Sequence, residues 1–124
     1  HTRQEKESAT PPPGVPGLET TLPLLLYAVH TGKLTLDRMV MLSCTNPWHI
    51  YRVPAPVGSF VEVEIDAPYR LPESGYITQC GWSPFAGCWA LGRVRHVQSR
   101  GREVWRDGRR LAKPGVGRDL ANCR

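Results

Sequence analysis

With 124 residues and 40% hydrophobic side chains, the chain has the size and composition of one small globular domain. Twelve prolines and twelve glycines indicate many loops. A membrane-spanning helix needs about 20 consecutive apolar residues, whereas residues 22–29 are far fewer and contain Pro23. The polar N-terminus lacks the order of a secretory signal, and we expect a cytoplasmic protein.

The net charge of +5 is concentrated in residues 93–113, where basic side chains crowd and only Glu103 and Asp107 oppose them. Such a cluster occurs on nucleic-acid-binding surfaces, and equally on solvated strand faces and subunit contacts. The segment has neither a zinc-finger spacing nor an aromatic RNA-binding signature. We therefore expect a solvated face or a subunit contact, not a nucleic-acid partner.

The cysteines show no C-x-x-C spacing and no histidine pair at zinc-finger distance. They are Cys44, Cys80, Cys88 and Cys123. Free thiols in a reducing compartment are expected.

The chain opens with a charged segment, residues 1–6, that leads into a proline- and glycine-rich loop at residues 11–17. Proline fixes φ and removes a backbone donor, while glycine permits positive φ, so the loop should be stiff with exposed backbone groups. It is either a plain linker that feeds a helix or a loop that carries binding atoms.

A helix is predicted after this loop because apolar residues recur at helical spacing. The residues on its expected buried face are Leu18, Leu22, Leu25, Leu26 and Val29. Thr20 or Thr21 can cap its start, Pro23 is tolerated in the first turn, and Gly32 is a natural stop.

Thr35 is a good N-cap for a second helix, and Asp37 in the first turn would favour the helix dipole. Its expected inward face consists of Leu36, Met39, Val40 and Ser43. Asn46 followed by Pro47 then predicts a new cap and a short helical turn that ends near Tyr51.

The pattern changes after Pro54-Ala55-Pro56. Residues 58–66 alternate between apolar and acidic side chains, which predicts a half-buried strand with Val61, Val63 and Ile65 on one face. Residues 67–84 look irregular.

Residues 93–97 and 103–105 are predicted strands, linked through residues 99–101. Asp107-Gly108 is a two-residue hairpin signal. Helices followed by short strands indicate an α+β arrangement, but its core would be thin, so the pattern suits the end of a larger fold.

Several segments resemble, in order, motifs of the dihydroorotases in the cyclic amidohydrolase superfamily. They are His-Thr-Arg-Gln-Glu-Lys (1–6), Pro-Pro-Gly-Val-Pro-Gly-Leu-Glu-Thr (12–20), Thr-Asn-Pro-Trp-His-Ile-Tyr (45–51), Gly-Trp-Ser-Pro-Phe-Ala-Gly (81–87) and Arg-Gly-Arg-Glu-Val-Trp-Arg-Asp-Gly (100–108). The chain is most like the dihydroorotase domain of multifunctional animal pyrimidine-synthesis proteins.

The resemblance implies an α/β fold that is a fragment of the family domain. Residues 1–56 would be the last β/α units of a distorted (β/α)8 barrel, with its terminal loop and helices. Residues 57–117 would be the C-terminal strands of a small β-sandwich, and residues 118–124 the start of a linker or tail.

Members of this family interconvert N-carbamoyl-L-aspartate and L-dihydroorotate in pyrimidine synthesis, using zinc-activated hydroxide and an aspartate that shuttles the proton. By resemblance, His1 would help to bind the substrate carboxylate, and backbone groups of Pro13 and Gly14 would help to seat the ligand. His1 corresponds to the last residue of the family's Asp-x-Ala-Pro-His motif.

The family's metal ligands and catalytic aspartate have no counterpart in this sequence, so we expect no catalytic residue and no metal ligand here. Zinc would belong to the intact domain, and the chain alone would be inactive. The remaining histidines, on a predicted helix, a helix end and a strand, are assigned structural or surface roles. They are His30, His49 and His96.

Two alternatives remain open. The parent protein would be a non-catalytic relative that serves structure or assembly, or else a dihydropyrimidinase or hydantoinase relative, although the loop at residues 12–19 favours dihydroorotase. Expected partners are the rest of the barrel, carbamoyl-phosphate synthetase and aspartate transcarbamoylase domains, and further copies of the protein; no membrane contact is expected.

Overall fold

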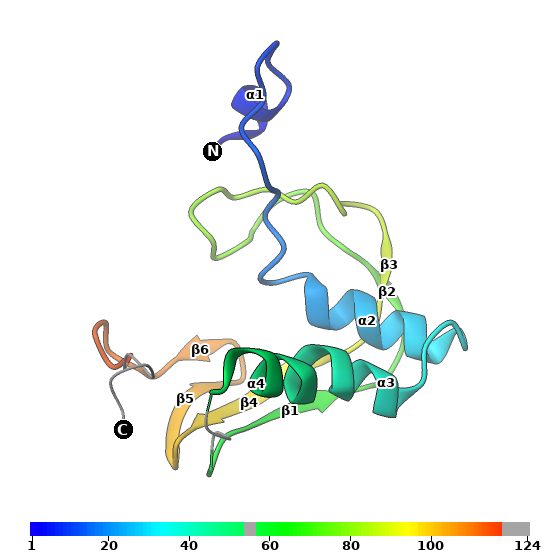
Figure 1. The fold of residues 1–124 in the computed structure, drawn as a ribbon. Coiled ribbons are helices and arrows are strands. Elements are labelled where there is room, and N and C mark those ends of the chain that lie inside the picture. Colours follow the sequence, from blue (N-terminus) through cyan, green and yellow to red (C-terminus); the bar gives the residue numbers. More distant parts are fainter. Residues whose placement is uncertain (54–56, 118–124) are drawn as a thin grey trace. The chain divides into compact units, whose positions relative to one another are not determined.

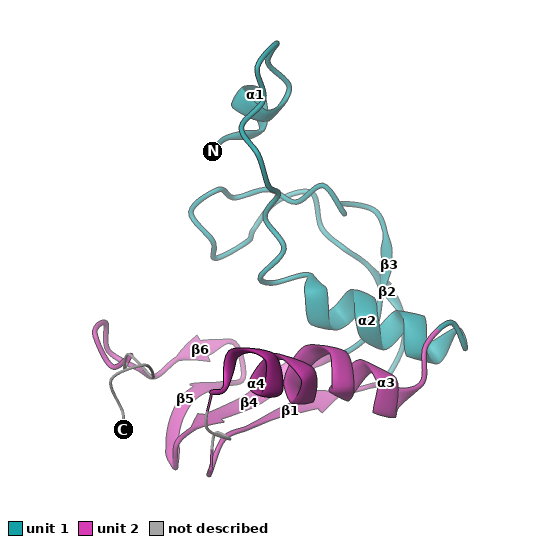
Figure 2. Cartoon of the chain, viewed as in Figure 1, with its two compact units in different colours: residues 1–33, 66–92 teal, residues 34–65, 93–124 magenta. Residues whose placement is uncertain are grey.

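The computed structural model of the chain describes residues 1–53 and 57–117. It divides into two compact units, each built from two separate stretches of sequence (Figures 1 and 2). Unit 1 contains residues 1–33 and 66–92, and unit 2 contains the described parts of residues 34–65 and 93–117. The predicted linker at 118–124 and the Pro54-Ala55-Pro56 segment lie outside the described residues.

Unit 1 combines helices with a short antiparallel ladder. Its elements are α1 (Arg3–Lys6), α2 (Thr21–His30), β2 (Tyr69–Arg70) and β3 (Trp89–Ala90). Helix α2 packs against β3, and the backbone N–H of Leu91 donates to the carbonyl oxygen of Pro23 over 3.0 Å. We predicted irregular structure over residues 67–84, but the short strand β2 lies within this range; β3 lies beyond it.

The buried apolar residues of unit 1 form a small cluster around α2 and the β2–β3 ladder. They are Leu26, Leu71, Ala90 and Leu91, together with Pro23. The Tyr27 and Trp89 rings stack with centroids 6.4 Å apart, and the Arg70 guanidinium lies 4.1 Å from the Trp89 ring centroid. Aromatic and cation–π contacts thus extend a core that aliphatic side chains alone would leave small.

The predicted first helix is confirmed, but two details of it are wrong. Leu18, expected on the buried face, is 90% exposed. The helix begins only at Thr21, so helical spacing does not govern a residue in the preceding turn. Thr20 precedes the helix without a side-chain cap; its hydroxyl instead donates to the carbonyl oxygen of Gly17 over 3.3 Å, and that of Thr21 does so over 2.7 Å.

The Glu19 carboxylate joins the start of this helix to a distant loop within unit 1. It accepts hydrogen bonds from the backbone N–H groups of Ile77 (3.0 Å) and Thr78 (2.8 Å). Partial burial raises the pKa of Glu19, but these bonds and one from the Thr78 hydroxyl outweigh it and hold the pKa below its ordinary value. The ionised carboxylate therefore fixes the 77–78 loop.

Unit 2 opens with one continuous helical run. It consists of α3 (Leu36–Val40), the π-helical turn η1 (Met41–Thr45) and α4 (Asn46–Tyr51). The predicted cap at Thr35 is confirmed, because its hydroxyl accepts from the backbone N–H of Arg38 over 3.2 Å. Of the predicted inward face only Met39 is buried.

The predicted short helical turn to Tyr51 is confirmed as α4, but the predicted cap at Asn46 is wrong, since Asn46 itself has helical dihedrals, φ −64° and ψ −45°. Pro47 cannot donate to the carbonyl of Ser43 and its ring crowds that turn. The wider π-helical turn immediately before it accommodates this defect without ending the run.

The sheet of unit 2 is antiparallel, with strand order β1-β4-β5-β6 (Figure 1). Its strands are β1 (Phe60–Glu64), β4 (Arg93–Ser99), β5 (Arg102–Arg106) and β6 (Arg109–Arg110). The predicted strands are therefore confirmed. Expected burial on one face of the predicted strand is wrong for Val61 and Ile65, which are 52% and 57% exposed.

Two tight turns set the register of this sheet. Arg100 and Gly101 join β4 to β5 with φ of 51° and 75°, and Asp107 and Gly108 join β5 to β6 with φ of 45° and 81°. Two consecutive residues with positive φ are the signature of the type I′ hairpin, whose twist matches that of the strands. The predicted Asp107-Gly108 hairpin is confirmed.

Three cysteines in the described residues, Cys44, Cys80 and Cys88, are free. Cys123 lies outside that part of the chain. No helix within the described ranges is long and apolar enough to cross a membrane.

Replacing Gly108 by alanine should destabilise the β5–β6 turn by about 1–2 kcal/mol, because a side chain disfavours the left-handed region. The control is Gly117→Ala: an added Cβ meets nothing within 4 Å at either position, but only Gly108 has a positive φ, of +81°. Urea unfolding should show the loss only for Gly108→Ala. Equal unfolding midpoints would contradict the assigned backbone geometry.

Glu19→Gln should release the 77–78 loop, because an amide cannot replace an ionised acceptor of two N–H groups. Hydrogen bonds to charged groups contribute about 1.5–3 kcal/mol, so amide hydrogen exchange in a peptide covering residues 77–78 should accelerate by about tenfold or more at pH 7. Asp66→Asn removes the charge of an exposed carboxylate of the same unit and should leave that peptide unchanged.

The same pair predicts a pH dependence. A carboxyl with a lowered folded-state pKa stabilises above its unfolded pKa of about 4.3, and this contribution is lost as the pH falls through the folded pKa. The difference in the free energy of unfolding between wild type and Glu19→Gln should therefore be largest at pH 7 and disappear at acidic pH. A difference that grows on acidification would contradict the role of the ionised Glu19.

Candidate substrate-binding segment

A capping box orders the residues directly after His1. The Thr2 hydroxyl accepts from the backbone N–H of Glu5 over 3.2 Å, and the Glu5 carboxylate accepts from the backbone N–H of Thr2 over 2.6 Å. The second bond lowers the pKa of Glu5. This reciprocal pair begins the single turn α1 and fixes the direction in which the chain leaves His1.

Trp82, from the 81–87 segment, contacts both the backbone and the ring of His1. Its indole Nε1–H donates to the carbonyl oxygen of His1 over 3.2 Å. The two rings lie with centroids 6.0 Å apart and planes inclined by 56°. His1 is exposed, so its imidazole is accessible to a ligand while its backbone is anchored.

The loop that carries Pro13 and Gly14 is tied back to α1. The Lys6 ammonium donates to the carbonyl oxygen of Pro12 over 2.6 Å. Pro13 and Gly14 follow directly and are exposed, and Gly14 has a φ of 80° that favours glycine. Both residues therefore lie on the surface, where a ligand can reach them.

A cavity of about 280 Å³ lies beside Trp82 and α1. Its lining residues are Arg3, Lys6, Glu7, Glu73, Trp82, Ser83, Pro84 and Ala86. None of the three predicted substrate-binding residues lines it. Charges of both signs surround it, since Arg3 pairs with Glu7 over 2.9 Å, so it offers no net attraction for an anion.

The three predicted site residues belong to one segment of unit 1, but no described hydrogen bond or ring contact joins His1 to Pro13 or Gly14. Within residues 1–53 and 57–117, no three His, Cys, Asp or Glu side chains lie close enough to hold a metal ion. The described residues therefore do not fit a zinc centre.

The other histidines come from other elements of the chain. His30 and His49 are exposed at helix ends, and the His96 ring meets Phe60 edge-on at 5.0 Å. His96 Nε2 lies 2.9 Å from a carboxylate oxygen of Glu103, close enough for an ion pair when protonated but without hydrogen-bond geometry.

Sequence reasoning missed Trp82 and Glu19 as organisers of this region. Both lie in segments that resemble family motifs, Trp82 in 81–87 and Glu19 in 12–20, and this resemblance was the one sequence signal that pointed to them. Their partners are more than fifty positions away along the chain, so no local pattern could identify the contacts.

Comparison with known proteins finds relatives among multifunctional proteins and dihydroorotases. It is 42% identical over 120 residues to multifunctional protein pyr1-3 of Dictyostelium discoideum, and 43% identical over 120 residues to multifunctional protein CAD of Squalus acanthias. Each match covers 97% of this chain and 5% of the relative. A dihydroorotase of Methanosarcina mazei is 32% identical over 131 residues, which is 28% of that protein.

A solved structure is also similar, the inactive dihydroorotase-like domain of a CAD-like multifunctional protein from Chaetomium thermophilum. The TM-score is 0.70 with 36% identity, covering 84% of this chain and 29% of the other. No family model matches the chain. It spans less than a third of the length of each of these four relatives. The chain is thus a mixed α/β homologue of part of the dihydroorotases, matching the dihydroorotase region of CAD-type multifunctional proteins.

Proposed function

We propose that this chain is the closing part of a dihydroorotase domain. The intact domain would reversibly cyclise N-carbamoyl-L-aspartate to L-dihydroorotate, and the chain alone would be inactive. The observation that carries this proposal is the 42–43% identity to the dihydroorotase region of two multifunctional proteins over 97% of the chain. The dihydroorotase relatives favour this substrate class over that of dihydropyrimidinases.

Within that domain, residues 1–56 would complete a (β/α)8 barrel and residues 57–117 would contribute strands to a β-sandwich. Exposed apolar side chains support the existence of further covering structure. The helical run of unit 2 exposes Leu36, Val40, Met41, Leu42, Ile50 and Tyr51 to between 42% and 75%. Exposed apolar patches of this kind mark interaction surfaces, and the rest of the domain is the proposed cover.

His1, Pro13 and Gly14 would form part of the substrate-binding edge. Dihydroorotate carries a carboxylate, which requires hydrogen-bond donors because burying an unpaired charge is costly. The exposed His1 imidazole can donate to it, and the bond from Trp82 restrains the backbone that carries this ring. The N–H of the exposed residue Gly14, which follows the Lys6–Pro12 hydrogen bond, is the proposed backbone donor.

The described residues alone offer no metal centre, so a zinc ion of the intact domain would need ligands from other residues. The multifunctional relatives suggest that carbamoyl-phosphate synthetase and aspartate transcarbamoylase domains accompany this one. A cytoplasmic, self-associating protein remains our prediction.

The second candidate is a non-catalytic domain that serves assembly. It is favoured by the structural relative, which is an inactive dihydroorotase-like domain at 36% identity. The two candidates share this chain's architecture and differ in the chemistry that the rest of the domain supplies.

The isolated chain should not convert dihydroorotate, whereas the complete protein should, and His1→Ala in the latter should lower kcat/KM by about tenfold to a hundredfold. That range corresponds to the loss of a charge-assisted hydrogen bond of about 1.5–3 kcal/mol. A spectrophotometric dihydroorotate assay measures it. The matched control is His49→Ala, an exposed histidine on α4 that should leave kcat/KM unchanged.

Three outcomes of that assay are distinct. Activity in the isolated chain would overturn the proposal. A complete, folded protein without activity would establish the non-catalytic candidate. An active protein that His1→Ala leaves unaffected would keep the family activity but remove His1 from the substrate site.

A separate prediction concerns the apolar surface of the helical run. Ile50, 72% exposed in this chain, should be buried in the complete protein, so Ile50→Lys should destabilise that protein by about 2 kcal/mol or more. In the isolated chain the same change should reduce concentration-dependent association, measured by sedimentation velocity. His49→Lys, at the exposed neighbour, should do neither.

A further inference from the structure

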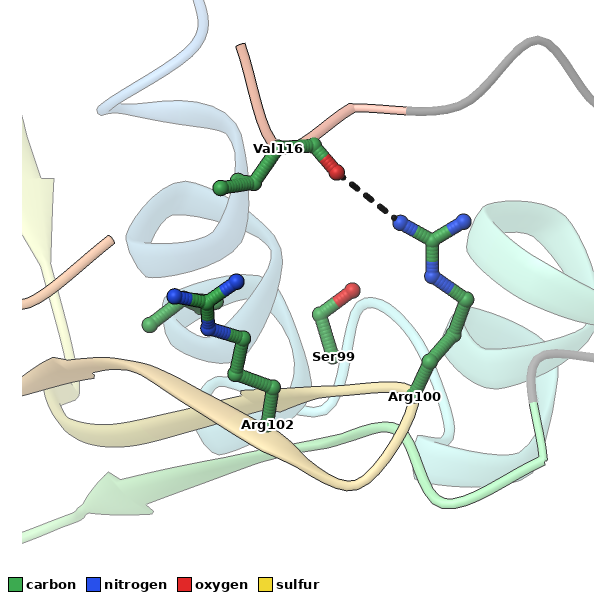
Figure 3. A pocket seen from close by; sticks show the side chains of 5 residues that line it. Ser99, Arg100, Arg102 and Val116 are labelled. Carbon is green, nitrogen blue, oxygen red and sulfur yellow. Dashed lines mark hydrogen bonds between the residues drawn. The ribbon is translucent and has the colours of Figure 1, made fainter. Parts of the chain in front are cut away.

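A second cavity, of about 210 Å³, lies at the β4–β5 turn of unit 2 (Figure 3). Its lining residues are Ser99, Arg100, Arg102, Val104 and Val116. Figure 3 shows the Arg100 and Arg102 side chains on either side of the Ser99 hydroxyl, with Val116 above them. No residue of the proposed dihydroorotate site takes part.

The hairpin register explains why these side chains share one face. Ser99 and Arg102 are direct partners across the β4–β5 ladder, so both project from the same side of the sheet. Val104 also lines the cavity, at the point where a register shift between Val97 and Gln98 makes it the extra residue of a β-bulge. Glu103, directly after Arg102, projects from the opposite face.

The turn that carries Arg100 is held by several hydrogen bonds. Its backbone N–H donates to the Ser59 hydroxyl over 2.8 Å, and the N–H of Gly101 donates to the carbonyl oxygen of Gly58 over 2.8 Å. The Arg100 Nη2 group donates to the carbonyl oxygen of Val116 over 3.2 Å. Both the backbone and the guanidinium of Arg100 are therefore in place before any ligand arrives.

The carboxylates of the same sheet are engaged elsewhere. Glu103 pairs with Arg106, and Glu64 and Asp107 both pair with Arg95. None of the described residues that line the cavity is acidic. The Arg102 guanidinium makes no hydrogen bond or ion pair with a described residue, so its planar fork of donors is available.

We propose that this cavity binds a phosphate-class oxyanion, either inorganic phosphate or the phosphoryl group of a small metabolite. Arg102 would supply a bidentate pair of N–H donors, the arrangement that suits phosphate oxygens. The Ser99 hydroxyl and the remaining N–H groups of Arg100 would complete the donor set. Val104 and the Val116 side chain would provide the apolar wall.

The first test uses arginine-selective labelling by phenylglyoxal in the complete protein, read out residue by residue by mass spectrometry. Inorganic phosphate should slow modification of Arg102 several-fold relative to chloride at equal ionic strength, and leave Arg109 on β6 unaffected. Adenosine monophosphate provides the second arm: protection at a much lower concentration than inorganic phosphate identifies a phosphate ester as the ligand. No protection at Arg102, or equal protection at Arg109, would overturn the proposal.

The second test compares Arg102→Gln with Arg109→Gln, an equal change of charge at an exposed position of the same sheet. Phosphate should raise the melting temperature of the wild type and of Arg109→Gln, and this rise should be lost in Arg102→Gln. The same rise in all three proteins would indicate a general ionic effect and refute the site. If Arg102→Gln does not fold, the labelling of the wild-type protein decides.

Discussion

Very little apolar side chain is buried in either unit. Among the described residues the buried hydrophobic ones are Leu26, Met39, Leu71, Ala90 and Leu91. A core this small supplies limited stabilisation, because the hydrophobic contribution scales with the area removed from water. Local polar contacts therefore matter for holding the loops in place. Notable among them are the hydrogen bonds of the Glu19 carboxylate to the 77–78 loop and of the Lys6 ammonium to the proline-rich loop.

Features set by neighbours along the chain were predictable from the sequence. The Thr35 cap and the Asp107-Gly108 turn depend on a few adjacent dihedral angles, and both are present as expected. The predicted burial of Leu18 and the predicted cap at Asn46 were wrong because each depends on where a helix begins or continues, which packing decides. Helical spacing alone cannot locate that boundary.

The candidate site likewise contains residues that the sequence identified and contacts that it could not. His1, Pro13 and Gly14 were identified by resemblance, since their residue types follow a recognisable order. Trp82, whose side chain holds His1, lies 81 positions away along the chain, so this contact could not be deduced from spacing. The cavity at the β4–β5 turn was hidden for another reason: the arginines of residues 93–113 look alike in sequence, and only their pairing separates them.

The π-helical turn at Met41–Thr45 also determines which way α4 faces. Such a turn contains one residue more than an α-helical turn, and each residue advances an α-helix by about 100°. Ile50 and Tyr51 are therefore rotated by roughly that angle from where a regular continuation of α3 would carry them. A one-residue deletion within this turn would turn their apolar surface toward a different neighbour, so length as well as composition specifies the face that this helical run offers.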